Sequence, residues 1–356
     1  MKITKYILFY FLFFSIFILI IELLIRLFTP FPITPSSNQK YHPELGYVLK
    51  KNIADVDNFG FRSMTKYEDA ELIVIGDSHT YGYDAHTKDS FVSFLDNAYN
   101  AGIPSYGIFN YIYLSDIAIK NNKNVLITLY PQNDFIYGKS FCYIDLNSAF
   151  WVSKLKELKI KIDNSVCKKN DLKKDQNIKA VLKSIGIISI LDYYIYTPIS
   201  SKLSKKIVLK KNNNKFEFDQ LRFNAVYGNS ASIEKRFYLL KYFSKYLNNL
   251  NNNKKKINIY FMLIPSREDF ELKKISDKNI NLKDFFSNET LKNIKNYNKK
   301  IKLIEKLIIE NNFKLLTHDV VLSNMKENIE YWGGHPNKYG YKSYAESVIK
   351  FLENTN

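Results

Sequence analysis

Cysteine is scarce in this chain, which has 356 residues and only two cysteines, Cys142 and Cys167. Neither stands at zinc-site spacing from a histidine or from the other cysteine, so the sequence excludes a zinc centre built on thiolates. The spacing leaves open whether the two form a disulfide, which a location outside the cytoplasm would permit. We expect no metal ion and no cofactor.

Acidic residues are also in short supply. The chain has 35 Asp and Glu against 52 Lys and Arg, which gives a formal net charge of +17. A basic balance can indicate binding to nucleic acid or to an anionic membrane surface. Here the lysines are spread along the chain together with Asn, Ile, Tyr and Phe, which indicates compositional drift rather than a dedicated binding patch. Because no nucleic-acid-binding motif is present either, we predict no nucleic-acid partner.

The N-terminal segment lacks charge over the length of a membrane span. From Tyr6 to Ile25 the only charged residue is Glu22, and about 20 apolar residues suffice for a helix to cross a bilayer. A cleaved signal peptide is the alternative, but no small-residue cleavage site follows the run. Lys2 and Lys5 precede it, which favours a cytoplasmic N-terminus. We therefore predict a single-pass membrane protein whose main domain is extracytoplasmic, in a periplasm or at a cell surface.

The chain divides into three parts on this interpretation. Residues 1–29 are the transmembrane anchor, and residues 30–68 are a proline-containing linker followed by an N-terminal strap packed on the domain. Residues 69–356 form one domain with an insertion at about 139–230, where lysines cluster and the regular pattern is lost. The insertion could be a lid over the site or a solvated decoration.

Short apolar runs alternate with amphipathic segments in the main domain. Leu72 to Ile75 is a continuous apolar run rich in β-branched residues, which is typical of a strand buried on both faces. Strands that alternate with helices predict a parallel α/β sheet. Further strands are expected at Asn124–Tyr130, Ile257–Ile264 and Phe313–Leu316, helices at Asp89–Asp96, Asn110–Lys120, Phe237–Leu247, Glu289–Asn311 and Lys338–Leu352, and a loop at Ala101–Gly107 after Ala98–Asn100.

A serine and a histidine stand at positions where such a sheet places its ligands. Ser78 follows the strand at Leu72–Ile75 almost at once, and the carboxyl ends of parallel strands line the ligand crevice. Its backbone N–H would open the next helix, where an anion can be stabilised. His335 lies in a glycine-rich loop before the last helix and is a candidate general base for Ser78. The alternative for both is a structural one, in which they only cap or connect elements.

Taken together, these segments resemble the SGNH, or GDSL, hydrolase family over about residues 70–138 and 257–352. The similar blocks are Gly76–Ser78, Asn100–Gly107, Pro131–Asp134 and His335–Asn337, in family order. The resemblance implies a flavodoxin-like three-layer α/β/α fold. It also implies that Ser78 is the nucleophile and His335 the base. The oxyanion hole would consist of the backbone N–H groups of Ser78 and Ser105 and the side-chain amide of Asn133.

The chain departs from the family at the residue that orients the histidine. The family has an aspartate two or three residues before it, where this chain has Trp332 and Gly333. Three interpretations stay open. The site could work as a Ser–His dyad, with a backbone carbonyl fixing the tautomer. Another acid, Glu330 or Asp319, could orient the imidazole. Or the site could be inactive, since loss of the orienting acid costs a serine protease about four orders of magnitude.

These features together predict O-acyl ester chemistry. We expect an esterase or O-acetyltransferase that acts on acyl groups, most simply acetyl groups, of a cell-envelope glycan; the glycan is what anchored relatives of the family imply. The expected partners are the acylated carbohydrate, the membrane bound through the N-terminal helix and, for transfer, a membrane-bound acyl donor. The alternative is a glycan-binding or assembly subunit that keeps the fold without the activity.

Overall fold

The structure is a computed structural model that describes residues 2–28, 39–51, 55–134, 139–158, 206–211, 214–228, 231–252, 257–326, 329–332 and 334–355. Two predicted segments therefore lie outside the described residues: the first part of the linker and the middle of the insertion. Cys142 is disulfide-bonded, and Cys167 lies outside the described part of the chain.

The core is a five-stranded sheet in which every neighbouring pair is parallel. Its order is β4-β3-β5-β8-β9, which is the 2-1-3-4-5 order of flavodoxin-like sheets when the core strands are counted along the chain. The predicted parallel α/β sheet is therefore confirmed. The strands are β3 (Leu72–Gly76), β4 (Ala98–Gly102), β5 (Asn124–Leu129), β8 (Ile259–Leu263) and β9 (Lys314–Leu316).

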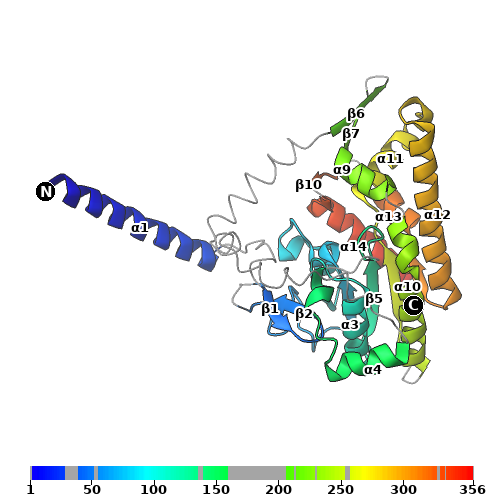
Figure 1. The fold of residues 1–356 in the computed structure, drawn as a ribbon, viewed down its shortest axis with the longest axis horizontal. Helices are drawn as coiled ribbons and strands as arrows, with labels where there is room; N and C mark the ends of the chain where they lie inside the picture. The colour runs from blue at the N-terminus through cyan, green and yellow to red at the C-terminus, as the bar shows by residue number, and fades with distance from the viewer. Residues whose placement is uncertain are drawn as a thin grey trace.

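Helices cover both faces of this sheet, which makes the domain a three-layer α/β structure (Figure 1). Side chains of β3 alternate between the faces: Ile73 and Ile75 join one buried cluster, while Leu72 and Val74 join the other. This alternation explains why the strand is apolar throughout. The first cluster includes residues of α3 (Ile108–Lys120), α10 (Ala231–Asn252) and α12 (Asn288–Glu310), the second includes residues of α13 (His318–Asn324) and α14 (Lys338–Glu353), and α11 (Arg267–Asp277) contributes to both.

Two local expectations were wrong. Ala98–Gly102 is the edge strand β4 rather than the lead into a loop. The polar residue Asn100 can be buried in this strand because its side chain makes two hydrogen bonds. The helix expected at Asp89–Asp96 is replaced by two short 3₁₀ turns, η2 (Thr87–Asp89) and η3 (Phe91–Phe94), which bury Phe91 against the second cluster.

Before the sheet, the chain forms a helix and a hairpin. Helix α1 spans Lys2–Phe28, and β1 (Gln39–His42) pairs antiparallel with β2 (Gly46–Leu49). The hairpin packs on the domain: Tyr47 donates from its hydroxyl to the carbonyl of Pro104 at 2.6 Å, and Tyr106 donates to the carbonyl of Tyr47 at 2.6 Å. Within the part of the chain that the structure describes, no helix has the length and hydropathy of a membrane span.

The described parts of the insertion pack on the domain. Phe216 and Phe218 are buried, and the ring of Phe223 stacks on that of Phe286 at a centroid distance of 5.2 Å. The aromatic contacts make the described residues 214–228 an integral part of the fold. The elements of the insertion are η4 (Lys139–Tyr143), α4 (Ala149–Leu158), β6 (Lys206–Lys211), β7 (Asn214–Asp219), α9 (Gln220–Phe223) and η7 (Asn224–Gly228); η8 (Leu282–Asp284) lies before α12.

Candidate active site

Ser78 begins a one-turn helix directly after the first core strand. Helix α2 spans Ser78–Tyr81, and Asp77 caps it by accepting a hydrogen bond from the N–H of His79 at 2.9 Å. The N–H of Ser78 lies at the N-terminus of this turn, where a helix offers no acceptor of its own. Ser78 is 8% exposed, so the hydroxyl is sheltered from bulk water at the carboxyl edge of the sheet.

His335 is brought to this serine from the other end of the chain. It lies in a small hairpin in which β10 (Tyr331–Trp332) pairs with β11 (His335–Pro336), and Asn337 then caps α14. The Nε2 atom of His335 lies 2.8 Å from the Oγ atom of Ser78. This is the contact that a base needs to take the hydroxyl proton.

Aromatic rings hold the imidazole of His335 in place. The ring of Tyr83 lies 4.7 Å from it and the ring of His79 lies 4.9 Å from it, centroid to centroid. Tyr83 is itself fixed by a hydrogen bond from the hydroxyl of Tyr341 to its carbonyl, at 2.8 Å. Packing on both rings restricts the orientation of the imidazole, and a fixed orientation is what proton transfer to and from Ser78 requires.

A carboxylate that the sequence analysis did not consider faces the other nitrogen of His335. The Oδ2 atom of Asp84 lies 3.5 Å from Nδ1, and the two side chains are 11% and 19% exposed. The contact is longer than a good hydrogen bond, as catalytic contacts often are before substrate binds. Ser78, His335 and Asp84 thus form a chain of hydroxyl, imidazole and carboxylate in the order of a catalytic triad.

The turn after α2 places Asp84. Gly82 ends the helix in the left-handed conformation, with φ 77°, and Asp84 is itself left-handed with φ 62°. Glycine adopts such values freely, and aspartate tolerates them better than most residues. A strained residue that carries a functional side chain is common at active sites. The carboxylate that faces His335 therefore comes from the turn that follows Ser78, six positions after it.

The two acids proposed from the sequence lie elsewhere, and Asp84 corrects that expectation. The carboxylate of Asp319 pairs with Lys302 at 2.7 Å and with Nδ1 of His318 at 3.4 Å. Glu330 is exposed, and its main-chain carbonyl accepts a hydrogen bond from the N–H of Asn337. The SGNH resemblance points to an acid in the segment before the histidine, whereas Asp84 lies far from His335 in the sequence. The only signal for Asp84 in the sequence is a turn with an acidic residue shortly after the serine.

Asn133 reaches the turn of Ser78 from beyond the end of β5, the strand that pairs with β3. Its turn follows β5, and its Nδ2 atom donates to Oδ2 of Asp77 at 2.9 Å. The Oγ atom of Ser78 lies 3.4 Å from the same carboxylate oxygen. Asp77 thus joins the nucleophile's turn to the Asn133 loop. An amide nitrogen carries two protons, so one remains for a ligand when the other is donated to Asp77.

Ser105 lies in the turn that follows β4. Its φ is 67°, in the left-handed region that glycine adopts most freely. The turn is joined to the end of β3 by a hydrogen bond from Ile103 N–H to the carbonyl of Gly76, at 3.3 Å. On the inner side of the turn, a Cβ added to Gly102 would lie 2.5 Å from the nitrogen of Tyr81. The absence of a side chain there lets the loop approach α2.

Burial controls the charge of the carboxylates under the site. It raises the pKa of Asp77, although hydrogen bonds from Asn133 and His79 oppose the shift. It also raises the pKa of Asp134 well above its usual range, helped by the charge of Asp77. Burial lowers the pKa of His79, and the nearby charge of His335 lowers it further. The imidazole of His79 is therefore neutral at neutral pH. Of these two histidines, His335 is the one whose ring nitrogen is shown within hydrogen-bond distance of the Ser78 hydroxyl.

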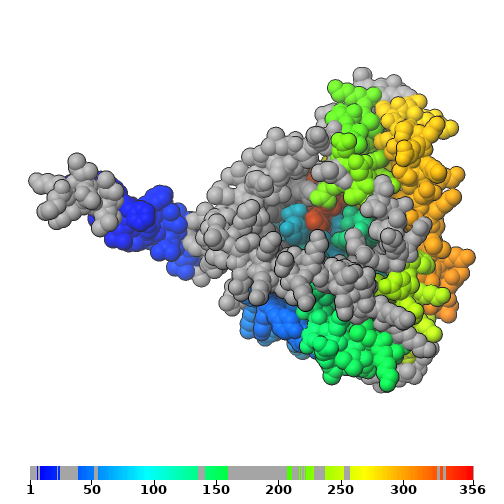
Figure 2. All heavy atoms as spheres, in the orientation of Figure 1, coloured from blue at the N-terminus to red at the C-terminus, as the bar shows by residue number. Residues whose placement is uncertain are grey.

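Among the described residues, no group of His, Cys, Asp or Glu side chains is arranged to hold a metal ion. Figure 2 shows a face of the molecule on which cyan, green and orange-red atoms, from three distant segments of the chain, are seen together near the centre. Comparison with known proteins gave no matching family model, no matching curated protein and no matching solved structure.

Proposed function

We propose that this protein is a serine-dependent O-acyl ester enzyme, either an esterase or an O-acetyltransferase. The observation that carries the proposal is the contact between Ser78 and His335 together with the approach of Asp84 to the second ring nitrogen. A serine hydroxyl becomes a useful nucleophile when a base takes its proton. The geometry also supports the SGNH resemblance, because the serine, the asparagine and the histidine lie at the carboxyl edge of one parallel sheet.

The reaction would begin with attack of Ser78 Oγ on the acyl carbonyl while Nε2 of His335 takes the proton. Asp84 would keep the proton on Nδ1 and stabilise the imidazolium that forms. His335 then returns its proton to the departing sugar oxygen, which leaves an acyl-serine. Water, or a hydroxyl of an acceptor sugar, attacks the acyl group in the second half with His335 again as base. The two acceptors distinguish hydrolysis from transfer.

The negative charge of the tetrahedral intermediate would be stabilised from two sides. The N–H of Ser78 at the start of α2 and the N–H of Ser105 are backbone donors, and the remaining amide proton of Asn133 is a side-chain donor. Removing one such donor typically costs about 3–4 kcal/mol of transition-state stabilisation. A backbone donor does not depend on its side chain, so serine in place of glycine at position 105 is compatible with this role.

The substrate proposed is an O-acetylated glycan of the cell envelope. This rests on the resemblance and on the apolar run at Tyr6–Ile25, which we take as a membrane anchor with the domain outside the cytoplasm. The disulfide at Cys142 supports an oxidising compartment. A membrane-bound acyl donor would be the further partner if the reaction is transfer.

The second candidate is a glycan-binding subunit without activity. It is favoured by the missing acid before His335, and the position of Asp84 beside Nδ1 of that histidine supports the enzyme instead. The test is hydrolysis of 4-nitrophenyl acetate by the full chain in detergent. We expect turnover that Ser78→Ala reduces to the uncatalysed rate. Equal rates for the two folded proteins would contradict the proposed activity and leave the binding function.

A further inference from the structure

The turn that carries Asp84 needs support from outside itself. Asp84 has a φ of 62°, and a residue with a side chain keeps this left-handed conformation only where its surroundings hold it. The turn has hydrogen bonds of its own: Tyr83 donates from its N–H to the carbonyl of Ser78 at 3.0 Å. Ala85 donates from its N–H to the carbonyl of Gly82 at 3.1 Å. These bonds close the turn, and side chains from distant parts of the sequence fix it on the domain.

A buried arginine of the N-terminal strap contacts the turn on both sides of the acid. The Nη2 atom of Arg62 donates to the carbonyl of Ala85 at 2.9 Å, and Nη1 donates to the carbonyl of Gly82 at 3.4 Å. Asp84 lies between these two residues in the chain. The guanidinium also lies over the ring of Tyr81, with its Cζ atom 5.0 Å from the ring centroid. One side chain therefore spans the turn from before the acid to after it.

Arg62 is itself fixed on its other side. Its side chain is 0% exposed, and its Nε atom lies 2.6 Å from Oδ2 of Asp55 and 2.7 Å from Oγ1 of Thr87. The hydroxyl of Thr87 donates to the same carboxylate oxygen. A buried charge has to be paired and hydrogen-bonded, and Asp55 meets that need. The carbonyls of the turn then receive hydrogen bonds from a charged donor, which are stronger than those between neutral groups.

A second buried side chain holds the same turn from the far end of the chain. The hydroxyl of Tyr341, in α14, donates to the carbonyl of Tyr83 at 2.8 Å, and Tyr341 is 0% exposed. Arg62 comes from the segment before the sheet and Tyr341 from the last helix, so the turn is fixed from two directions. Support of this kind around a left-handed residue is typical of a functional site, where the surroundings impose the conformation.

We propose that Arg62 is a positioning residue that holds the Asp84 turn so that the carboxylate faces Nδ1 of His335. This deepens the proposed function and rests on it. A misplacement of about 1 Å in an active site can cost about 100-fold in rate, so a fixed turn has a direct effect on the reaction. The proposal also gives the N-terminal strap a role, because the strap supplies the side chain that fixes the acid.

The first test is Arg62→Lys in the full chain in detergent. Lysine keeps a cation beside Asp55 but lacks the planar fork that reaches two carbonyls. We expect kcat for 4-nitrophenyl acetate to fall by about 10–100-fold with KM within about two-fold, because a misplaced acid weakens the transition state rather than binding. The matched control is Tyr99→Phe, which removes a contact of the strap with β4, the donation from the Tyr99 hydroxyl to Asp57 at 2.5 Å. This control should keep kcat within about two-fold of wild type.

A double variant separates positioning from a general loosening of the site. If Arg62 acts through Asp84, adding Arg62→Lys to Asp84→Asn should lower kcat by no more than about two-fold further. Thr87→Val keeps the arginine and its carboxylate partner, so it tests the same point with less disturbance of the fold. We expect it to lower kcat by about 3–10-fold, and again with no further loss on Asp84→Asn. Additive losses in the double variants, or unchanged kcat in folded Arg62→Lys, would overturn the assignment.

Hydrogen exchange tests the support without turnover. The amides of Tyr83 and Ala85 are bonded within the turn, and mass spectrometry of a peptide spanning residues 79–90 reports their exchange. Arg62→Lys should speed this exchange by about ten-fold or more while peptides of β5 keep wild-type rates, and Tyr99→Phe should leave it unchanged. Unchanged exchange in Arg62→Lys would overturn the proposal. A wild-type protein that cleaves no ester would instead contradict the proposed function, and the exchange rates would still decide whether Arg62 holds the turn.

Discussion

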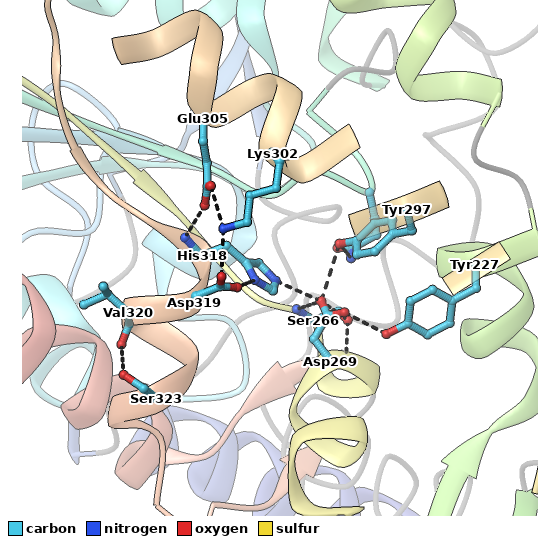
Figure 3. A network of polar contacts seen from close by, with 11 residues as sticks. Tyr227, Ser266, Asp269, Tyr297, Lys302, Glu305, His318, Asp319, Val320 and Ser323 are labelled. Atoms are coloured by element: carbon cyan, nitrogen blue, oxygen red, sulfur yellow. Dashed lines mark hydrogen bonds and ion pairs between the residues drawn. The ribbon is translucent and has the colours of Figure 1, made fainter. Parts of the chain in front are cut away.

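Among the described residues, the domain contains two groups of serine, histidine and aspartate at the same edge of its sheet, and only one has the order of a catalytic triad. The second group, shown in Figure 3, consists of Ser266, Asp269 and His318. There the Oγ atom of Ser266 donates to Oδ2 of Asp269 at 2.7 Å, and Nε2 of His318 lies 3.2 Å from the same oxygen. In this group an aspartate faces Nε2 of the histidine, whereas in the candidate active site a serine hydroxyl does.

The difference decides what each histidine can do. Both ring nitrogens of His318 face carboxylates, since Nδ1 lies 3.4 Å from Asp319. Burial lowers the pKa of His318, but the hydrogen bonds and charges of Asp269 and Asp319 outweigh it and raise the pKa to about 9. This histidine is a cation at neutral pH and cannot accept a proton. His335 meets a hydroxyl on one side and a carboxylate on the other, which is the arrangement of a base.

The second group serves instead as a structural junction. Hydroxyls of Tyr227 and Tyr297 donate to Asp269, at 2.7 and 3.4 Å, which joins η7 and α12 to α11 (Figure 3). The side chain of Gln132 donates to the hydroxyl of Tyr297 at 2.7 Å. Since Gln132 precedes Asn133, the junction also supports the loop that carries the proposed oxyanion donor. The same residue types therefore form a triad-like arrangement in one place and a structural network in the other.

Removing the acid should break the first group and leave the second intact. We expect Asp84→Asn to lower kcat for 4-nitrophenyl acetate by about three to four orders of magnitude, because the imidazole loses the group that fixes its tautomer. Asp319→Asn and Glu330→Gln should leave kcat within about two-fold. Steady-state kinetics on the three variants checks this. Full activity of Asp84→Asn would contradict this prediction and indicate a dyad of Ser78 and His335 without an acid.

Breaking the second group should affect stability rather than chemistry. His318→Gln leaves Asp269 buried without its cation, which should lower the free energy of unfolding by about 3–5 kcal/mol. The folded pKa of His318 is raised from 6.5 to about 9. Its contribution is therefore fully present below pH 6.5 and lost as pH rises through about 9. Urea unfolding of wild type and His318→Gln at several pH values should show a difference that shrinks in this window. A constant difference would mean that the imidazolium is not the source.

Asn133 tests the oxyanion side of the first group. Asn133→Ala should lower kcat by about 10²–10³-fold, because one donor to the oxyanion is lost. The matched control is Gln132→Ala, which removes the neighbouring amide and its bond to Tyr297 and should change the unfolding midpoint more than kcat. If Asn133→Ala keeps at least half of wild-type turnover, the amide only holds Asp77.

The smallest effect is expected at Ser105. Ser105→Gly keeps the backbone N–H and removes a side chain at φ 67°, where glycine is less strained. We expect turnover within about two-fold of wild type and a change in unfolding free energy below about 1 kcal/mol. Kinetics and urea unfolding on the variant measure both. A loss of ten-fold or more would show that the serine side chain itself takes part.

The sequence alone predicted the strand that precedes Ser78, the loop of His335 and, in all, four of the five core strands. These predictions depended on continuous apolar runs, and such runs are what buried parallel strands require. Strand β4 was missed because buried Asn100 interrupts its pattern and is satisfied by partners distant in the sequence, such as the carbonyl of Thr80. Helices α11 and α13 were not predicted from the sequence.

The acid could not be found by pattern because its partner is distant in the sequence. Asp84 meets His335 only after the sheet has brought α2 and the last hairpin together. In the sequence, Asp84 lies shortly after Ser78, and Asp319 lies before His335. They differ in their surroundings in the folded chain: Asp84 lies in a left-handed turn, whereas Asp319 forms an ion pair with Lys302. Both are properties of the folded chain.

Covalent labelling tests the central claim most directly. The full chain in detergent is treated with a fluorescent alkyl phosphonofluoridate, and the modified peptide is mapped by mass spectrometry. The two serines serve as internal comparison. We predict modification at Ser78 and none at Ser266, with labelling lost in Ser78→Ala and at least ten-fold slower in His335→Ala and Asp84→Asn. An unlabelled folded protein, or labelling that persists in Ser78→Ala, would contradict the account.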